Sequence, residues 1–240
     1  MLISEILEAV SISLPPQWIE PLDRHRSQLA MLPPNECNIR FMELDEIQEM
    51  LTFTSQIEVF HDILLLWTDD ESNYIGVFYK GPLSYRICAV RHEETDISPM
   101  FCDLSSFLMQ WEQRPSAMWS EWRRDYPATL EYSVAEKQMQ LDVECIIELQ
   151  SRLQQMDIDD DLRCQWLYCI MALTPAQQLH TLYHYVQDED MYVQERACEI
   201  LGYHRDEQAL EWLADVVRIG SPNGKTAAKQ AIARIKGYIQ

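Results

Sequence analysis

Two hydrophobic periods divide this chain, and the first of them predicts a small sheet. Short apolar runs predict four strands, at residues 38–42, 62–68, 74–80 and 85–92. The polar connections between the last three strands are only five and four residues long. Connections that short force neighbouring strands to run antiparallel, because a parallel crossover needs about a dozen residues or more. Helices are predicted around these strands, at residues 3–10, 17–31, 44–51 and 103–111.

From Leu130 onward the apolar period changes from 2 to 3.6, and no credible strand remains. Six amphipathic helices are predicted, at residues 139–153, 162–170, 174–186, 193–202, 206–220 and 226–239. Short loops between such helices make antiparallel hairpins. The predicted class is therefore α+β, with an antiparallel sheet flanked by helices followed by an all-α domain. The predicted divisions are an α+β domain at residues 1–112, a tryptophan-rich connector at 113–129 and a helical domain at 130–240.

The net charge narrows the choice of partner. Lys and Arg total 19 against 39 Asp and Glu, so the formal charge is −20. This argues against nucleic acid as a partner, since binding to phosphates needs cationic residues. It favours a basic partner, although solubility alone would explain the same charge. Residues 216–240 hold five bases and no acid, which we interpret as a final helix whose cations complement its dipole and the acidic body, with a second binding patch as the alternative.

The seven cysteines do not form any Cys-x-x-Cys pair, and their number is odd. At the start of the chain, Glu5 and Glu8 stand where a signal peptide would need a basic segment and an uninterrupted apolar run. No segment approaches the ~20 apolar residues of a membrane span. We therefore expect a cytoplasmic protein that does not bind membranes and whose thiols are reduced and buried.

No residue pattern predicts catalysis, and we expect no cofactor and no metal. Residues 220–226 resemble a phosphate-binding P-loop, but three residues separate the glycines where four are required. Ser221 and Thr226 are therefore interpreted as turn and cap residues. His180 and His184 have a spacing that can bind zinc in an α-helix, yet no third ligand is evident, so a pair of surface histidines is predicted.

Acidic clusters and tryptophans supply the candidate residues for partner binding. The candidates are Asp69, Asp70 and Glu71 at a hairpin tip, Glu93, Glu94 and Asp96 after the last strand, and Trp119 and Trp122 in the connector. Tryptophan is enriched at binding hot spots, but packing a seam between two domains is the preferred interpretation for rings that bury so much area. Helix caps and solvated faces would explain the acidic clusters one by one.

Several motifs in the first half occur in a recognisable order. Leu14-Pro15-Pro16 precedes a helix, Ile39-Arg40-Phe41 leads into a second helix, and a final helix carries Ser105-Ser106-Phe107-Leu108. With the three-strand run between them, residues 1–112 resemble the SUKH superfamily of Smi/Knr-like proteins. That family includes cytosolic immunity proteins of bacterial polymorphic toxin systems and a fungal regulator of cell-wall synthesis. The asparagine-glycine that often follows the first helix is replaced here by residues 32–36.

The second half contains a weak repeat. Leu167, Ala197 and Ala231 occupy like positions, and residues 195–201 resemble residues 229–235. Residues 160–239 thereby resemble a HEAT-type array, a family in which small alanines let paired helices approach closely and each pair buries its face on the next. A plain helical bundle explains the same pattern. HEAT-type arrays usually serve as protein-binding surfaces.

The two resemblances and the charge together imply a function. The SUKH resemblance implies a cytosolic immunity protein that binds a cognate polymorphic toxin, and the acidic charge favours a basic toxin domain. Neutralisation would come from covering the toxin's active site. The alternative is a cytosolic scaffold or regulator without a toxin partner, which would use the helical array to hold a client. An unrecognised hydrolase is the third candidate, and no oligomeric state is predicted.

Overall fold

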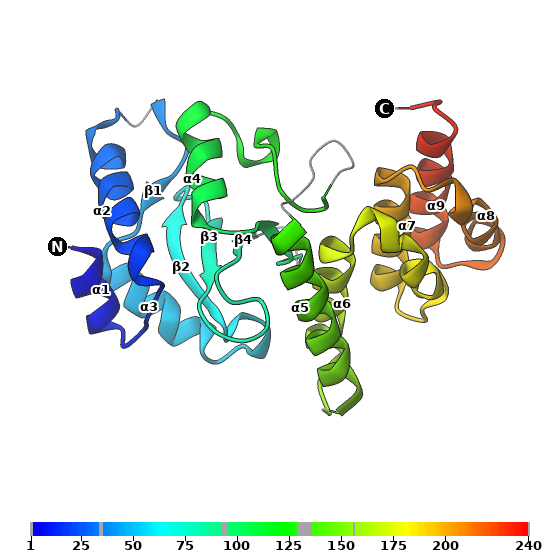
Figure 1. The fold of residues 1–240 in the computed structure, drawn as a ribbon, viewed down its shortest axis with the longest axis horizontal. Helices are drawn as coiled ribbons and strands as arrows, with labels where there is room; N and C mark the ends of the chain where they lie inside the picture. The colour runs from blue at the N-terminus through cyan, green and yellow to red at the C-terminus, as the bar shows by residue number, and fades with distance from the viewer. Residues whose placement is uncertain (1, 34–35, 93–95, 129–135, 156, 240) are drawn as a thin grey trace. The chain divides into compact units, whose positions relative to one another are not determined.

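The chain divides into two compact units, Met1–Asp125 and Tyr126–Gln240 (Figure 1). The computed structural model describes residues 2–33, 36–92, 96–128, 136–155 and 157–239. We call Met1–Asp125 the sheet unit and Tyr126–Gln240 the helical unit. The α+β class is as predicted. The division falls inside the predicted connector, and the segment that carries Trp119 and Trp122 belongs with the sheet.

The sheet unit contains five strands in the order β1-β2-β3-β4-β5, and each neighbouring pair is antiparallel, as predicted. The strands are β1 (Arg40–Phe41), β2 (Ile63–Thr68), β3 (Tyr74–Phe78), β4 (Ile87–Val90) and β5 (Pro99–Phe101). The helices are α1 (Ile3–Ala9), α2 (Pro16–Met31), α3 (Leu44–Thr54) and α4 (Leu104–Gln113). Strand β5 was not predicted. It is three residues long and begins with a proline, which a strand tolerates at its first position.

Aromatic rings fill the core of the sheet unit. Every residue of β2 is buried, so both faces of the sheet are covered. Trp67 of β2 is 0% exposed and contacts the rings of His25 from α2 and Phe107 from α4, with centroids 5.9 Å and 4.8 Å away. Asp103 caps α4 by accepting a hydrogen bond from the Ser106 amide at 2.9 Å. The aromatic core therefore fixes α2 and α4 against the sheet.

The chain itself occupies polar groups at both outer strands. At β1, the Cys37 thiol donates to the Ile39 carbonyl at 2.9 Å, and the Arg40 guanidinium donates to the Phe41 carbonyl at 3.5 Å. At β5, the Asp125 amide donates to the Met100 carbonyl and the Asp125 carboxylate accepts from the Cys102 amide, both at 2.9 Å. Covered edges discourage pairing with the strand of another chain.

The helical unit contains no strand among its described residues. Its elements are α5 (Glu136–Gln155), α6 (Asp160–Leu173), the 3₁₀ helix η4 (Ala176–Gln187), α7 (Met191–Tyr203), α8 (Leu210–Ile219) and α9 (Pro222–Ile235). Successive elements pair as α5 with α6, η4 with α7 and α8 with α9, while α7 also packs against α6 and α9. This is an arrangement of stacked helical pairs. The HEAT-type assignment itself stays a prediction.

Small residues and one buried glutamine hold the last two pairs together. A Cβ added to Gly202 of α7 would lie 2.6 Å from the Ala231 Cα of α9, so only hydrogen fits at this contact. Gln194 of α7 is buried and donates to the Val186 carbonyl at 3.0 Å. Its side-chain oxygen accepts from the amide and the hydroxyl of Ser221, at 2.7 Å and 2.8 Å. Gln194 thus links η4, α7 and the start of α9.

Two local predictions for the helical unit differ in outcome. Ser221 is the N-cap of α9 and accepts from the Gly224 amide at 3.0 Å, whereas Thr226, the predicted start of this helix, lies inside it and donates to the Pro222 carbonyl at 3.1 Å. The Thr174 hydroxyl, just before the next helical segment, donates backward to the Ile170 carbonyl at 2.7 Å. The segment that follows is a 3₁₀ helix rather than the α-helix expected at residues 174–186.

Candidate functional site

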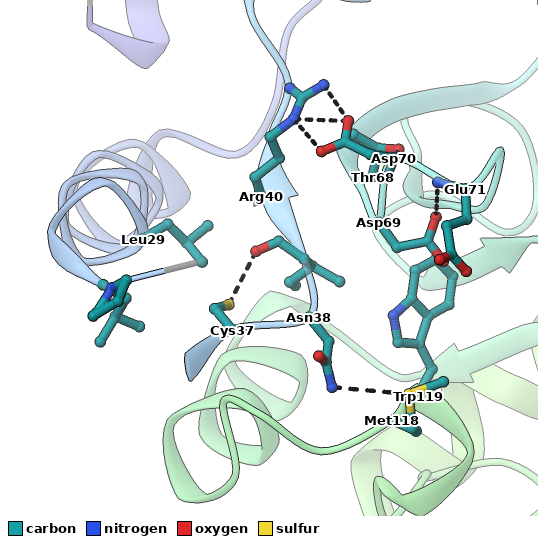
Figure 2. Close-up of a pocket in the computed structure, with 13 residues that line it drawn as sticks. Leu29, Cys37, Asn38, Arg40, Thr68, Asp69, Asp70, Glu71, Met118 and Trp119 are labelled. Carbon is teal, nitrogen blue, oxygen red and sulfur yellow. Dashed lines mark hydrogen bonds and ion pairs between the residues drawn. The ribbon is translucent and has the colours of Figure 1, made fainter. Parts of the chain in front are cut away.

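A pocket of about 570 Å³ opens beside the hairpin between β2 and β3 (Figure 2). The end of α2, the approach to β1, the hairpin tip and a segment after α4 form its walls. We call it the hairpin-tip pocket. Its lining residues are Leu29, Leu32, Pro33, Cys37, Asn38, Ile39, Arg40, Thr68, Asp69, Asp70, Glu71, Met118 and Trp119.

Asp69 builds the tip of this hairpin. One of its carboxylate oxygens accepts from the amides of Glu71 and Asn73, at 2.8 Å and 3.2 Å. The other oxygen accepts from the Asn73 side chain at 2.8 Å. The next residue, Asp70, has a φ of 63°, a left-handed conformation that aspartate tolerates in turns. The Asp69 carboxylate therefore stabilises the turn, because both of its oxygens already accept hydrogen bonds within the hairpin.

Arg40 fastens the tip to β1. Its Nε donates to both oxygens of Asp70 at 2.9 Å (Figure 2), and its two terminal nitrogens donate to Glu46 at 2.6 Å and 2.7 Å. The hydrogen bonds that Arg40 donates to Glu46 and to Asp70 raise the pKa of Arg40 above its usual range, and the bond to Glu46 has the larger effect. The bond from Arg40 lowers the pKa of Glu46 in return. One guanidinium thus holds both Asp70 and Glu46, and because it balances only one of the two carboxylate charges, the three side chains together stay negative.

Glu71 is the uncommitted carboxylate of the tip. Its side chain is exposed and forms no hydrogen bond or ion pair with other described residues. Three carboxylates line the pocket against the single guanidinium of Arg40, so the local potential is negative. Glu71 is therefore the lining carboxylate that is free to pair with a cation, and Asp69 and Asp70 precede it in the same turn.

Met118 and Trp119 form an apolar wall of the pocket. The Met118 side chain is 61% exposed, whereas Trp119 is buried at 7%. Asn38 holds this wall in place, because its backbone amide donates to the Pro115 carbonyl at 3.4 Å and its side-chain amide donates to the Ser116 carbonyl. The pocket therefore joins an apolar wall to a negative rim.

The other candidate residues lie elsewhere. Trp122 is 4% exposed, contacts the Phe107 ring and donates to the Arg114 carbonyl at 3.4 Å, which places it inside the sheet unit. Asp96 accepts from the Ser98 amide at 2.8 Å and forms the turn into β5. Glu93 and Glu94 lie outside the described residues. The structure thus brings Asp69, Asp70, Glu71 and Trp119 together at one pocket.

Sequence reasoning did not single out Arg40, Asn38 or Met118. A cation within an apolar strand is the one local signal that Arg40 offered, since such residues are rarely left unpaired. Its partner Asp70 is 30 residues away, so the pairing depends on the fold. Asn38 contacts a segment 78 residues further along, for which the sequence offered no signal.

The structure also bears on metals and membranes. Within the described residues, no group of three or more His, Cys, Asp or Glu could hold a metal ion. His180 and His184 lie on the 3₁₀ helix η4, where residues four apart point in different directions and the zinc spacing of an α-helix does not apply. Every helix in the described part of the chain is too short or too polar to span a membrane.

Comparison with known proteins adds no relative. The chain matches no family model, no curated protein and no solved structure. The SUKH and HEAT-type resemblances therefore remain predictions from the residue patterns.

Proposed function

We propose that this chain is a cytoplasmic immunity protein of the SUKH type that neutralises a cognate polymorphic toxin. It binds a basic toxin domain and covers the toxin's active site, a role that needs no catalysis by the chain itself. The hairpin-tip pocket is the observation that carries the proposal. The order of motifs in residues 1–112 and the net charge of −20 support it.

The pocket suits a long basic side chain from the partner. The aliphatic part of a lysine or arginine would pack on Met118, while its charged head reached Glu71 at the rim. Polar groups at both sheet edges are already hydrogen-bonded within the chain. Recognition would therefore depend on side chains rather than on an added strand.

The two walls of the pocket should act on different rate constants. Rim charges such as Glu71 steer the encounter between partners and raise the association rate. Apolar contacts made after docking, such as those of Met118, mainly slow dissociation. Exposed charges are screened over ~8–10 Å at 0.10–0.15 M ionic strength, so association should slow as salt rises.

Co-expression with the toxin encoded by a neighbouring gene tests the proposal directly. The chain should rescue cells from that toxin, and the two proteins should co-purify. Absence of binding at low salt and micromolar concentration would falsify the immunity proposal. Binding without salt dependence would keep the function and remove the electrostatic argument.

Two matched variants locate the contact. Glu71→Lys should lower the association rate by about tenfold at low salt, because it reverses the uncommitted rim charge. Glu49→Lys is the control, since Glu49 is an exposed acid of α3 that makes no ion pair with described residues and does not line the pocket. Met118→Ala should instead raise the dissociation rate. Equal effects of the two lysine variants would show that net charge, not the pocket, drives association.

A scaffold or regulator without a toxin partner is the second candidate. The stacked helical pairs favour it, together with exposed aromatic side chains on that unit, including Tyr192 at 50% and Trp212 at 37% exposure. A client held there should be lost in Trp212→Ala and kept in Glu71→Lys. The opposite pattern favours the immunity function.

A further inference from the structure

The last helix carries an unpartnered stripe of lysines. At 100° per residue, Lys225, Lys229 and Lys236 fall within about 40° of one another and span about 17 Å of α9 and its cap. Lys229 and Lys236 are exposed and Lys225 is half-buried. None of the three pairs with an acid among the described residues. We call these three residues the lysine stripe.

On the helical wheel, the stripe lies apart from the buried residues of α9. The buried side of α9 consists of Gly224, Ala227, Ala228 and Ala231, and α7 packs against it. The helix dipole accounts for a cation at Lys236, near the C-terminal end. It does not account for Lys225, which lies in the first turn, where the dipole disfavours positive charge. The interpretation that these cations stabilise their own helix therefore explains Lys236 and leaves Lys225 unexplained.

We infer that the lysine stripe docks on the hairpin-tip pocket of a second copy of this chain. The pocket supplies the free carboxylate of Glu71 and the apolar surface of Met118. The stripe supplies the long cationic side chains of Lys225, Lys229 and Lys236. Charge complementarity favours this occupant, because residues 1–215 hold all 39 acids and the basic tail holds none.

This contact is heterologous, since the stripe of one copy meets the pocket of the next. It can therefore extend beyond a dimer. Two chains of charge −20 repel each other at long range, but screening within ~8 Å at 0.15 M salt leaves the contact pairs as the main electrostatic effect. The association is accordingly weak and concentration-dependent, and it is lost at high salt.

Sedimentation velocity over a concentration series tests the stripe. Lys229→Glu/Lys236→Glu should weaken self-association by about tenfold or more relative to the wild type. Arg24→Glu/Lys137→Glu is the matched control, because it changes the net charge equally at two exposed cations that make no ion pair with described residues. Equal weakening by both variants, or a wild-type chain that stays monomeric at millimolar concentration, overturns the proposal.

Complementation between variants identifies the pocket as the other half of the contact. Glu71→Lys alone and Lys229→Glu/Lys236→Glu alone should each be monomeric. Their mixture retains one intact stripe and one intact pocket, so it should form a 1:1 dimer and nothing larger. A mixture that stays monomeric overturns the pairing. No toxin is present in these measurements, so their failure leaves the proposed immunity function standing, and the reverse also holds.

Discussion

The sheet unit and the helical unit differ in how their buried polar atoms are hydrogen-bonded. In the sheet unit, both ring nitrogens of His25 and the indole nitrogens of Trp67 and Trp111 are buried without a hydrogen-bond partner among the described residues. In the helical unit, the Nε2 of His204 is likewise buried without a partner among the described residues, but Gln194 is hydrogen-bonded at both ends, and the buried Asp142 accepts from the Tyr126 hydroxyl at 2.7 Å. The first core thus depends on ring packing and the second on polar links between helices. Different substitutions and conditions should therefore destabilise the two units.

Removal of the central ring should have the largest effect. Trp67→Ala leaves a cavity where a fully buried side chain stood, so the free energy of unfolding of the sheet unit should fall by about 3–5 kcal/mol. Hydrogen exchange followed by mass spectrometry can report on each unit separately. Faster exchange should be confined to residues 1–125. Equal acceleration in the helical unit would show that the two units unfold together and would break the comparison.

Loss of the Gln194 hydrogen bonds should have the second-largest effect on stability. Gln194→Ala leaves the Val186 carbonyl and the Ser221 amide without their partner, which should cost the helical unit about 3 kcal/mol. Gln177→Ala, at an exposed position of η4, is the control and should change little. Hydrogen exchange of α9 is the sensitive measurement. An unchanged α9 would mean that packing alone fixes this helix.

Acid should weaken the sheet unit more than the helical unit. Burial lowers the pKa of His25 to about 3, against 6.5 in an unfolded chain. The stability from a neutral His25 is therefore complete above pH 6.5 and is lost as pH falls toward 3, with about 2 kcal/mol lost at pH 5. His204 of the helical unit has its pKa lowered to about 4 by burial, but it is only half-buried, so its contribution should be smaller.

Urea unfolding at pH 7 and pH 5 measures this difference. His25→Phe removes the titrating group and should flatten the pH dependence of the sheet unit. His204→Phe is the companion variant and should leave that dependence intact. A sheet unit that is equally stable at both pH values would show that His25 is hydrated in solution.

Thiol labelling should distinguish the units with no effect on stability. Cys37 and Cys102 are half-buried, and both belong to the sheet unit, whereas the other five cysteines are buried. Burial raises the pKa of Cys198 to about 12, which suppresses the reactive thiolate. Native protein should therefore label at Cys37 and Cys102, and unfolded protein at all seven without prior reduction. Fast native labelling of Cys198 would indicate local opening of α7.

The periodicity of the sequence was enough to predict the antiparallel sheet and the helical second half. It missed β5, because a strand of three residues that begins with a proline does not establish a period. It also placed an α-helix at η4. The buried residues Leu179, Leu182 and Tyr185 recur every three positions, which is the 3₁₀ repeat, but over one short segment that spacing resembles an α-helix.

The candidate site was half visible in the sequence. Asp69, Asp70 and Glu71 stood out because three acids occupy one short loop between strands. The different roles of these three acids could not be predicted, since the ion pair of Asp70 with Arg40 exists only once β1 lies beside β2. Likewise, Trp119 and Trp122 look alike in the sequence. Packing decides that Trp119 lines the pocket and Trp122 contacts Phe107.

The position of Asp125 has a consequence for cutting the chain into parts. This residue closes the outer edge of β5 with two hydrogen bonds, although it lies 24 residues beyond the end of that strand. A fragment that stops at residue 112, the predicted domain end, would leave β5 as an open edge and invite aggregation between fragments. A fragment that ends after Asp125 keeps the two hydrogen bonds that cover the outer edge of β5. Limited proteolysis that cuts between residues 113 and 124 should accordingly release material that precipitates.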